Sequence, residues 1–226
     1  MRNYNLLDRE RIDWAWPDTE HTYDGKPKIG SSVCDESKFI LKFFKGKENG
    51  FAIDIGAADG ITHNNTFELF NKPYYWDGLS IEANPRFNKQ RKTLFKDTNV
   101  SVYCGAVSDI DGEINMKVYA GDRCGHSQVG KGDTIIKSMK INSLLEKYEV
   151  PNYIDFISMD IEGAEPSVLN NWDWGTYKVK LWCIENASKY IDLFEKNGYE
   201  CLNPNQKDFD EYKICHNNTF FVNKNI

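Results

Sequence analysis

Acidic side chains stand at or near the ends of four short apolar runs in this sequence, and an amide follows one of them. These residues are Asp54, Glu82, Asp160 and the pair Glu185-Asn186. Because the carboxyl ends of the strands in an open α/β sheet face one crevice, we expect these side chains to converge there. Buried acids are costly unless a cation or a donor satisfies them, so the crevice should receive such a group.

A glycine-bracketed turn follows Asp54. Gly56 and Gly60 suit a loop in which the backbone bends sharply and a ligand comes close. Glu82 lies about 20 residues further on, where an acid can bind the hydroxyls of a nucleoside ribose. A Gly-x-Gly-x-x-Gly motif is missing, and Asp54 would place negative charge beside a pyrophosphate. The pattern therefore favours S-adenosylmethionine, a cationic nucleoside without phosphate, over NAD.

Asp160, Glu185 and Asn186 could also hold a divalent metal, because carboxylate and amide oxygens are ligands that Mg²⁺ and Mn²⁺ prefer. This arrangement resembles the metal site of catechol-type O-methyltransferases. In those enzymes the ion holds a substrate hydroxyl and lowers its pKa. The alternative interpretation is that Asp160 and Glu162 cap the following helix, while Glu185 pairs with a lysine.

A methyl transfer to oxygen needs an aligned nucleophile and a base that takes its proton. His126, in the glycine-rich segment 120–133, is the favoured base because histidine titrates near neutral pH. His63 is a competitor, although it could simply contact the cofactor. Glu162 is the third choice, and each histidine could instead be an ordinary surface residue.

The bulk properties fit a single domain of 226 residues. A net charge of −6 and a pI of about 5.3 do not support nucleic-acid binding, and the basic residues of segment 86–96 are interpreted as a solvated helix face. No apolar run approaches the ~18 residues of a membrane span, and the sequence begins without a signal peptide pattern. Dispersed cysteines indicate reduced thiols, so we expect a cytoplasmic protein.

Alternating strand and helix patterns predict an α/β fold with a seven-stranded, mostly parallel sheet and helices on both faces. Residues 1–33 are expected to form an N-terminal extension or lid, and residues 34–226 the main domain. The predicted strands are 51–55, 78–82, 100–103, 154–159, 178–184, 199–202 and 219–222, and the last of these could run antiparallel. The predicted helices are 34–44, 64–71, 86–95, 143–148 with Asn142 as its cap, one through Val168, and 190–197. Residues 113–119 are expected to add a further β segment.

With these segments placed, the chain resembles the FkbM family of S-adenosylmethionine-dependent methyltransferases. The resemblance covers about residues 33–223, and the Asp-x-Glu-Gly-x-Glu pattern of 160–165 is its most specific part. The other matching segments are 51–60, Asn65-Thr66, 76–85, Ala106-Val107-Ser108 and 154–159. Lys140-Ile141-Asn142 departs from the family, which often has Thr-Leu-Asp there.

The resemblance implies a Rossmann-like class I methyltransferase fold and a set of site residues. Asp54, Gly56, Ala57 and Gly60 would surround the methionine end of the cofactor. Glu82 and Ala83 would lie at its ribose, and Ala106 and Val107 at its adenine. Asp160 and Glu162 would lie between cofactor and acceptor. His126, Asp160 and Glu162 are thus the catalytic candidates, and Asp160 is also counted among the cofactor-binding residues.

Family members usually methylate hydroxyls of sugars or secondary metabolites, so the resemblance implies O-methylation of a saccharide or glycan, which a divalent metal could assist. Exposed aromatic residues could stack on sugar rings: Trp14, Trp16, Tyr23, Trp172 and Trp174. The alternatives are a methyltransferase acting on a lipid, polyketide or nitrogen acceptor, or a catalytically silent binding module that keeps the fold.

Overall fold

The computed structural model describes residues 35–119, 126–130, 132–202, 212, 214–215 and 217–226. The expected extension 1–33, with its aromatic candidates Trp14, Trp16 and Tyr23, lies outside these residues. So does the segment 120–125 of the glycine-rich loop.

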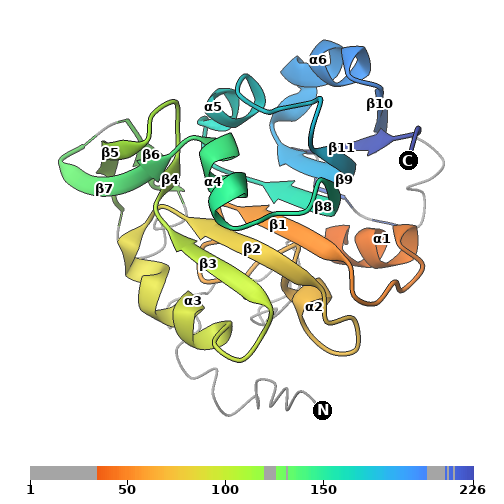
Figure 1. Ribbon diagram of the computed structural model, residues 1–226, viewed down its shortest axis with the longest axis horizontal. Coiled ribbons are helices and arrows are strands. Elements are labelled where there is room, and N and C mark those ends of the chain that lie inside the picture. Colours follow the sequence, from red (N-terminus) through yellow and green to blue (C-terminus); the bar gives the residue numbers. More distant parts are fainter. Residues whose placement is uncertain (1–34, 120–125, 131, 203–211, 213, 216) are drawn as a thin grey trace.

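The main sheet has seven strands and forms the centre of the domain (Figure 1). Its apolar strands are buried on both faces, as expected for parallel strands between helices. β11 is reversed and pairs antiparallel with both β9 and β10, whereas the other pairs of this sheet are parallel, which confirms the predicted mostly parallel sheet. In spatial order the strands are β10 (Tyr199–Leu202), β11 (Asn218–Asn223), β9 (Lys178–Glu185), β8 (Tyr153–Met159), β1 (Phe51–Ile55), β2 (Asp77–Glu82) and β3 (Val100–Cys104).

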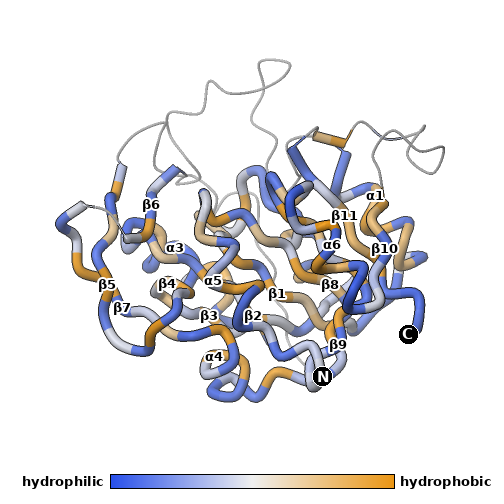
Figure 2. The backbone as a smooth tube through the Cα atoms, turned by 90° about the horizontal axis from the view of Figure 1, so that it is seen from above, coloured by the Kyte–Doolittle hydropathy of each residue, from blue (hydrophilic) through white to orange (hydrophobic). Residues whose placement is uncertain are grey.

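Helices cover both faces of this sheet. Alternate residues of each strand point to opposite faces, and both sets are apolar, so both faces are buried against helices. On β1, Ala52 packs with one cluster of buried residues, whereas Ile53 and Ile55 pack with the other. Hydrophobic stretches accordingly recur along β8 and β9 (Figure 2). The first cluster includes α1 (Glu36–Phe43), α2 (Phe67–Phe70) and α3 (Asn88–Leu94), and the second includes α4 (Ile141–Lys147), α5 (Glu165–Leu169) and α6 (Ile191–Lys196).

Two predicted helices are altered at their beginnings. The 3₁₀ turn η2 (Pro85–Phe87) precedes α3, and η4 (Ala187–Tyr190) precedes α6. The prediction that Asn142 caps a helix is wrong, because α4 already begins at Ile141 with Lys140 as its N-cap. The Asp111 carboxylate binds this end instead, accepting hydrogen bonds from Lys140 N at 2.9 Å and Ser143 Oγ at 3.0 Å.

A second sheet of four strands lies beyond the carboxyl ends of β2 and β3 (Figure 1). The predicted β segment 113–119 is confirmed as one of its strands, while the other three were not predicted. Met116 and Ile136 form its small apolar core together with Ala106. Its spatial order is β4 (Ala106–Val107), β7 (Thr134–Met139), β5 (Gly112–Lys117) and β6 (Gln128–Val129).

Trp172 and Trp174, two of the residues considered for sugar stacking, pack inside the domain. Trp172 is 4% exposed, and its ring lies 4.7 Å from that of Trp182. Trp174 packs edge-on against Phe194 at 5.3 Å. Burial of these apolar rings stabilises the face covered by α5 and α6. Trp172 is thereby unavailable to a saccharide, whereas Trp174 is partly buried and has most of its ring contacts inside the domain.

Two expectations about the chain as a whole can be compared with the described residues. Cys104, Cys183, Cys201 and Cys215 form no disulfide, in agreement with reduced thiols. Within the same part of the chain, no helix has the length and apolar character needed to cross a membrane.

Candidate functional site

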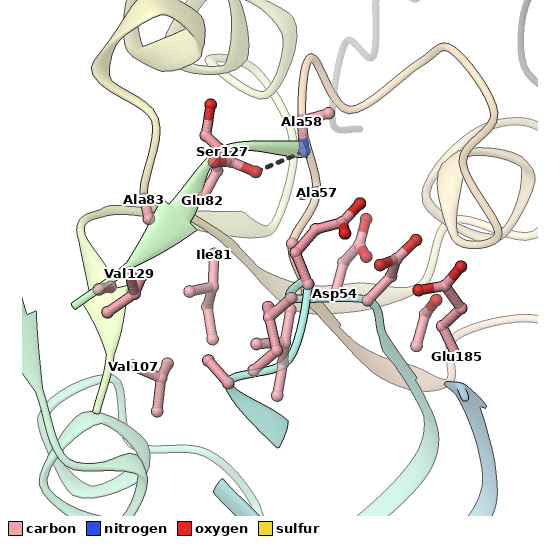
Figure 3. Close-up of a pocket in the computed structure, with 18 of the residues that line it drawn as sticks. Asp54, Ala57, Ala58, Ile81, Glu82, Ala83, Val107, Ser127, Val129 and Glu185 are labelled. Carbon is pink, nitrogen blue, oxygen red and sulfur yellow. Dashed lines mark hydrogen bonds between the residues drawn. The ribbon is translucent and has the colours of Figure 1, made fainter. Parts of the chain in front are cut away.

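A cavity of about 410 Å³ opens at the carboxyl ends of the central strands, a size typical of small-molecule sites. Five carboxylates line it, and they come from β1, β2, β9 and the segment that follows β8. These are Asp54, Glu82, Asp160, Glu162 and Glu185. The predicted convergence of acids on one crevice is therefore observed. Figure 3 shows Val107 and Val129 at one side of the cavity and Glu185 at the other.

Gly56 joins three strands at the base of the cavity. Its N–H and that of Ala57 each donate to Ile81 O at 3.0 Å, which ties the end of β1 to β2. The φ of Gly56 is +92°, and a β-carbon there would lie 1.8 Å from the carbonyl oxygen of Asp160. This glycine is required because the backbone after β8 passes directly against it.

Asp54 is a buried residue of the cavity lining and is held by polar neighbours. Its Oδ2 accepts hydrogen bonds from Asn64 Nδ2 at 2.7 Å and from Thr66 Oγ1 at 2.9 Å. Burial raises the pKa of Asp54 to about 6, although these two hydrogen bonds oppose the increase. A carboxylate in this position would gain from a cationic ligand that replaces the water it has lost.

The Asn64 side chain also explains why α2 is shorter than predicted. Its Oδ1 accepts from the backbone N–H groups of Thr66 at 2.9 Å and Phe67 at 2.8 Å. An asparagine that bonds to nearby backbone donors favours a turn over a continuous helix, so regular helix begins only at Phe67.

Glu82 is fixed at the end of β2 by two backbone donors. Ala58 N donates to its Oε2 at 2.8 Å (Figure 3), and Asn84 N donates to its Oε1 at 2.6 Å. Burial raises the pKa of Glu82, whereas these hydrogen bonds lower it. Since each carboxylate oxygen has two acceptor sites, both oxygens can still accept from a pair of ligand hydroxyls.

One wall of the cavity is apolar and combines residues of both sheets. Ala83, Ala106 and Val107, which were predicted to bind the cofactor, all line it. Four lining residues on this side were not predicted: the apolar Ile81, Met116 and Val129, and the polar Ser127. Ser127 is joined to the main domain because its Oγ accepts from Asn84 Nδ2 at 3.2 Å. Apolar side chains of this kind suit a flat aromatic base.

Asp160 and Glu185 lie together on the other side of the cavity. Loss of hydration and the charges of Glu185 and Glu162 raise the pKa of Asp160 to about 8. Like charges in close contact resist simultaneous ionisation, so this part of the site favours a shared proton, a cation or a hydrogen-bond donor.

His126 and Glu162, predicted independently as candidate bases, are brought together. The His126 Nδ1 atom lies 2.6 Å from Glu162 Oε1, and both residues line the cavity. Glu162 has a φ of +54°, which is uncommon for a residue with a side chain. A carboxylate at Nδ1 favours the tautomer that leaves Nε2 as the proton acceptor. His63, the competing histidine, also lines the cavity.

Two predicted site residues lie outside the lining of the cavity. Gly60 packs below it, where a β-carbon would lie 3.0 Å from Leu94 Cδ2 and 3.2 Å from Phe95 Cε2. Asn186 is exposed, and its backbone N–H donates to Asn217 O at 2.7 Å. The described residues include no group of three or more His, Cys, Asp or Glu side chains placed to hold a metal ion. Of the predicted metal set, only Asp160 and Glu185 share the cavity.

Polar residues after the glycine turn were missed as site residues. Asn64, Asn65 and Thr62 line the cavity, and Asn65 Nδ2 donates to Ser158 Oγ at 3.1 Å. Asn65-Thr66 already belonged to the matching motif. The signal that could have identified these residues was the uninterrupted polar segment 62–66, which begins two residues after Gly60.

Comparison with known proteins identifies the family. The sequence model of the methyltransferase FkbM domain matches residues 54–201. The chain belongs to the FkbM methyltransferase family. It is therefore an S-adenosylmethionine-dependent methyltransferase, and its α/β architecture is that of the class I enzymes. The expected family and fold are confirmed.

Solved structures of other methyltransferases resemble this FkbM-family chain. The O-methyltransferase from Bacillus cereus in complex with SAH is 11% identical with a TM-score of 0.49, covering 84% of this chain and 80% of that chain. Precorrin-6y C5,15-methyltransferase from Geobacter metallireducens GS-15 is 12% identical with a TM-score of 0.46, covering 92% and 97%. No individually curated protein sequence matched.

Proposed function

We propose that this FkbM-family enzyme transfers a methyl group from S-adenosylmethionine to a hydroxyl of a sugar or glycan. One observation carries the proposal: a single cavity combines buried acids with an apolar wall at one side and a second pair of acids at the other. The first part suits a cationic nucleoside, and the second suits an acceptor rich in hydroxyl groups.

The chemistry of the donor half fits S-adenosylmethionine. Asp54 would accept hydrogen bonds from the ammonium of the methionine part, and Glu82 would accept from the ribose hydroxyls. Ile81, Val107 and Val129 would contact the adenine. When bound, the donor supplies a methyl group already activated by a sulfonium. The protein therefore needs to hold the two reactants in line and to receive one proton.

In the acceptor half, Asp160 and Glu185 would accept hydrogen bonds from the hydroxyls of the saccharide. His126 Nε2 would take the proton of the reacting hydroxyl, while Glu162 holds Nδ1 and stabilises the charged imidazole. The reacting oxygen would form its C–O bond as the C–S bond of the donor breaks, and His126 would hold the released proton. The step is balanced without another reactant.

A divalent metal remains a separate hypothesis. Asp160 and Glu185 offer two oxygen ligands, but the third predicted ligand, Asn186, does not line the cavity. No step above requires an ion. Activity that survives EDTA would exclude the metal, whereas loss of activity restored by Mg²⁺ or Mn²⁺ would support it.

Donor binding can be tested by thermal shift. S-adenosylmethionine should raise the melting temperature of the wild type, and NAD should not, because only a ligand of the folded state stabilises it. Asp54→Asn should reduce the shift. Asp97→Asn is the matched control, because Asp97 is exposed on the loop before β3. An unchanged shift in Asp54→Asn would contradict the assigned donor half.

The acceptor can be tested with a labelled methyl donor and separate panels of neutral oligosaccharides, amines and lipids, followed by mass spectrometry of the product. Methylation of a saccharide hydroxyl is the expected result. Because paired carboxylates also bind ammonium groups, exclusive methylation of amines would favour the nitrogen-acceptor alternative. Donor binding without transfer to any panel would support a silent module.

A further inference from the structure

Arg91 lies in α3 and is completely buried, which the expected solvated basic face of segment 86–96 does not explain. Arginine is almost never fully buried unless its charge is compensated. Arg91 does not line the cavity. Its guanidinium nevertheless lies directly behind the end of β2, the strand that ends in Glu82.

The guanidinium connects β2 to β3. Arg91 Nη1 donates to Ser80 Oγ at 3.0 Å, and Nη2 donates to Tyr103 O at 2.9 Å. Nη2 also lies 3.5 Å from the backbone oxygen of Glu82 and 3.8 Å from Cys104 Sγ. A planar, forked group can bind both strands at once, which the single ammonium of lysine cannot reproduce.

These contacts do not include a carboxylate. Among the described residues, Arg91 forms no ion pair with a carboxylate, and its Nε atom has no hydrogen-bond partner. Burial accordingly lowers the pKa of the guanidinium, while the charges of Glu82, Cys104 and Asp54 raise it. The acids of the donor half therefore compensate part of the cost of burying this charge.

We propose that Arg91 is a positioning residue for donor binding: it holds the ends of β2 and β3 together and places a positive charge behind Glu82. The inference rests on the proposed role of Glu82 in binding the ribose. Arg91 opposes the rise that burial causes in the pKa of both Glu82 and Asp54. Cys104 and Tyr148 also lie near the Arg91 guanidinium, and the phenol of Tyr148, whose pKa is raised by burial, stays neutral near pH 7.

The test measures the affinity for S-adenosylmethionine by calorimetry across a pH series. Arg91→Gln removes the charge, so Asp54 and Glu82 should both protonate more easily. The pH below which binding is lost should rise by about one unit. Near the wild-type midpoint, affinity should fall by up to about tenfold, and raising the pH should restore most of it. A merely structural role would weaken binding equally at every pH.

Two further variants make the result decisive. Arg91→Lys keeps the charge but loses the fork, so it should weaken binding several-fold with an unchanged midpoint. Arg86→Gln, an exposed arginine on η2, should change neither quantity. A folded Arg91→Gln protein with the wild-type midpoint would overturn the proposal. If that variant does not fold, wild-type affinity of Arg91→Lys at every pH would overturn it.

Glu82→Gln separates this inference from the proposed function. Wild-type donor affinity in Glu82→Gln would show that Glu82 does not bind the donor, which would be a failure of the proposed site itself. Weak binding by Glu82→Gln together with an unchanged Arg91→Gln profile would leave the site intact and reject only the role of Arg91.

Discussion

Replacing Gly56 by alanine should lower the free energy of unfolding far more than the same replacement at Gly163. Comparing the two variants isolates the effect of the close contact between residue 56 and the Asp160 carbonyl. Both glycines have similar positive φ values, +92° and +99°. An alanine in that region costs roughly 1–2 kcal/mol at either site. A β-carbon at Gly163 meets nothing within 4 Å, whereas at Gly56 it would lie 1.8 Å from Asp160 O.

No side-chain rotation can relieve that overlap, because both atoms are fixed to the backbone. The ends of β1 and β8 would have to separate, which would break the hydrogen bond from Asp160 N to Ile55 O, 2.9 Å long. That bond contributes about 0.5–1.5 kcal/mol, and loosened packing adds to the loss. We expect Gly56→Ala to lower the free energy of unfolding by at least about 3 kcal/mol, compared with about 1–2 for Gly163→Ala.

Urea denaturation of the two variants measures this difference directly. Gly163→Ala should also keep its thermal shift with S-adenosylmethionine, while Gly56→Ala should lose it because Asp54 and Asp160 move apart. Gly56→Ala and Gly163→Ala proteins whose stabilities agree within about 1 kcal/mol, the usual scale of a single-site effect, would refute the close-approach argument.

Three other predictions concern single side chains. In the wild type, affinity for S-adenosylmethionine should fall as the pH drops through about 6, because protonation of Asp54 removes the charge that binds the ammonium. An affinity that calorimetry finds to be independent of pH in this range would contradict the prediction. His126→Ala should lower turnover about 10²-fold or more while donor affinity stays nearly constant, and equal loss of both would indicate a structural role. Asp155 lies outside the cavity and accepts hydrogen bonds from Lys47 Nζ at 2.6 Å and from Phe51 N at 3.0 Å. Asp155→Ala should therefore lower the free energy of unfolding by about 1–3 kcal/mol without affecting donor binding.

The main sheet and the acids at its strand ends were predictable because both follow from local patterns. The run 51–55 and the turn after it specify a buried parallel strand, and strand ends of such sheets converge by topology. Asp54 and Glu82 were therefore placed correctly in the cavity.

The second sheet was harder to predict because its pairing is non-local. β7 (Thr134–Met139) has only two buried residues, Ile136 and Ser138, so its alternating pattern is weak. Arg91 was misread for a related reason: a basic residue in an amphipathic helix usually faces solvent. Its burial depends on partners in β2 and β3, which helix periodicity cannot reveal.

The position of β11 has a consequence for synthesis of the chain. Among the strands that the structure describes, β10 pairs with β11 alone, and β11 inserts between β9 and β10 although it follows both in sequence. Phe221 of β11 is fully buried and stacks on Phe194 at 3.9 Å. On the ribosome, the edge of β9 and this aromatic surface must stay uncovered until residues 218–223 have emerged. Nascent chains are therefore expected to need chaperone protection during that interval.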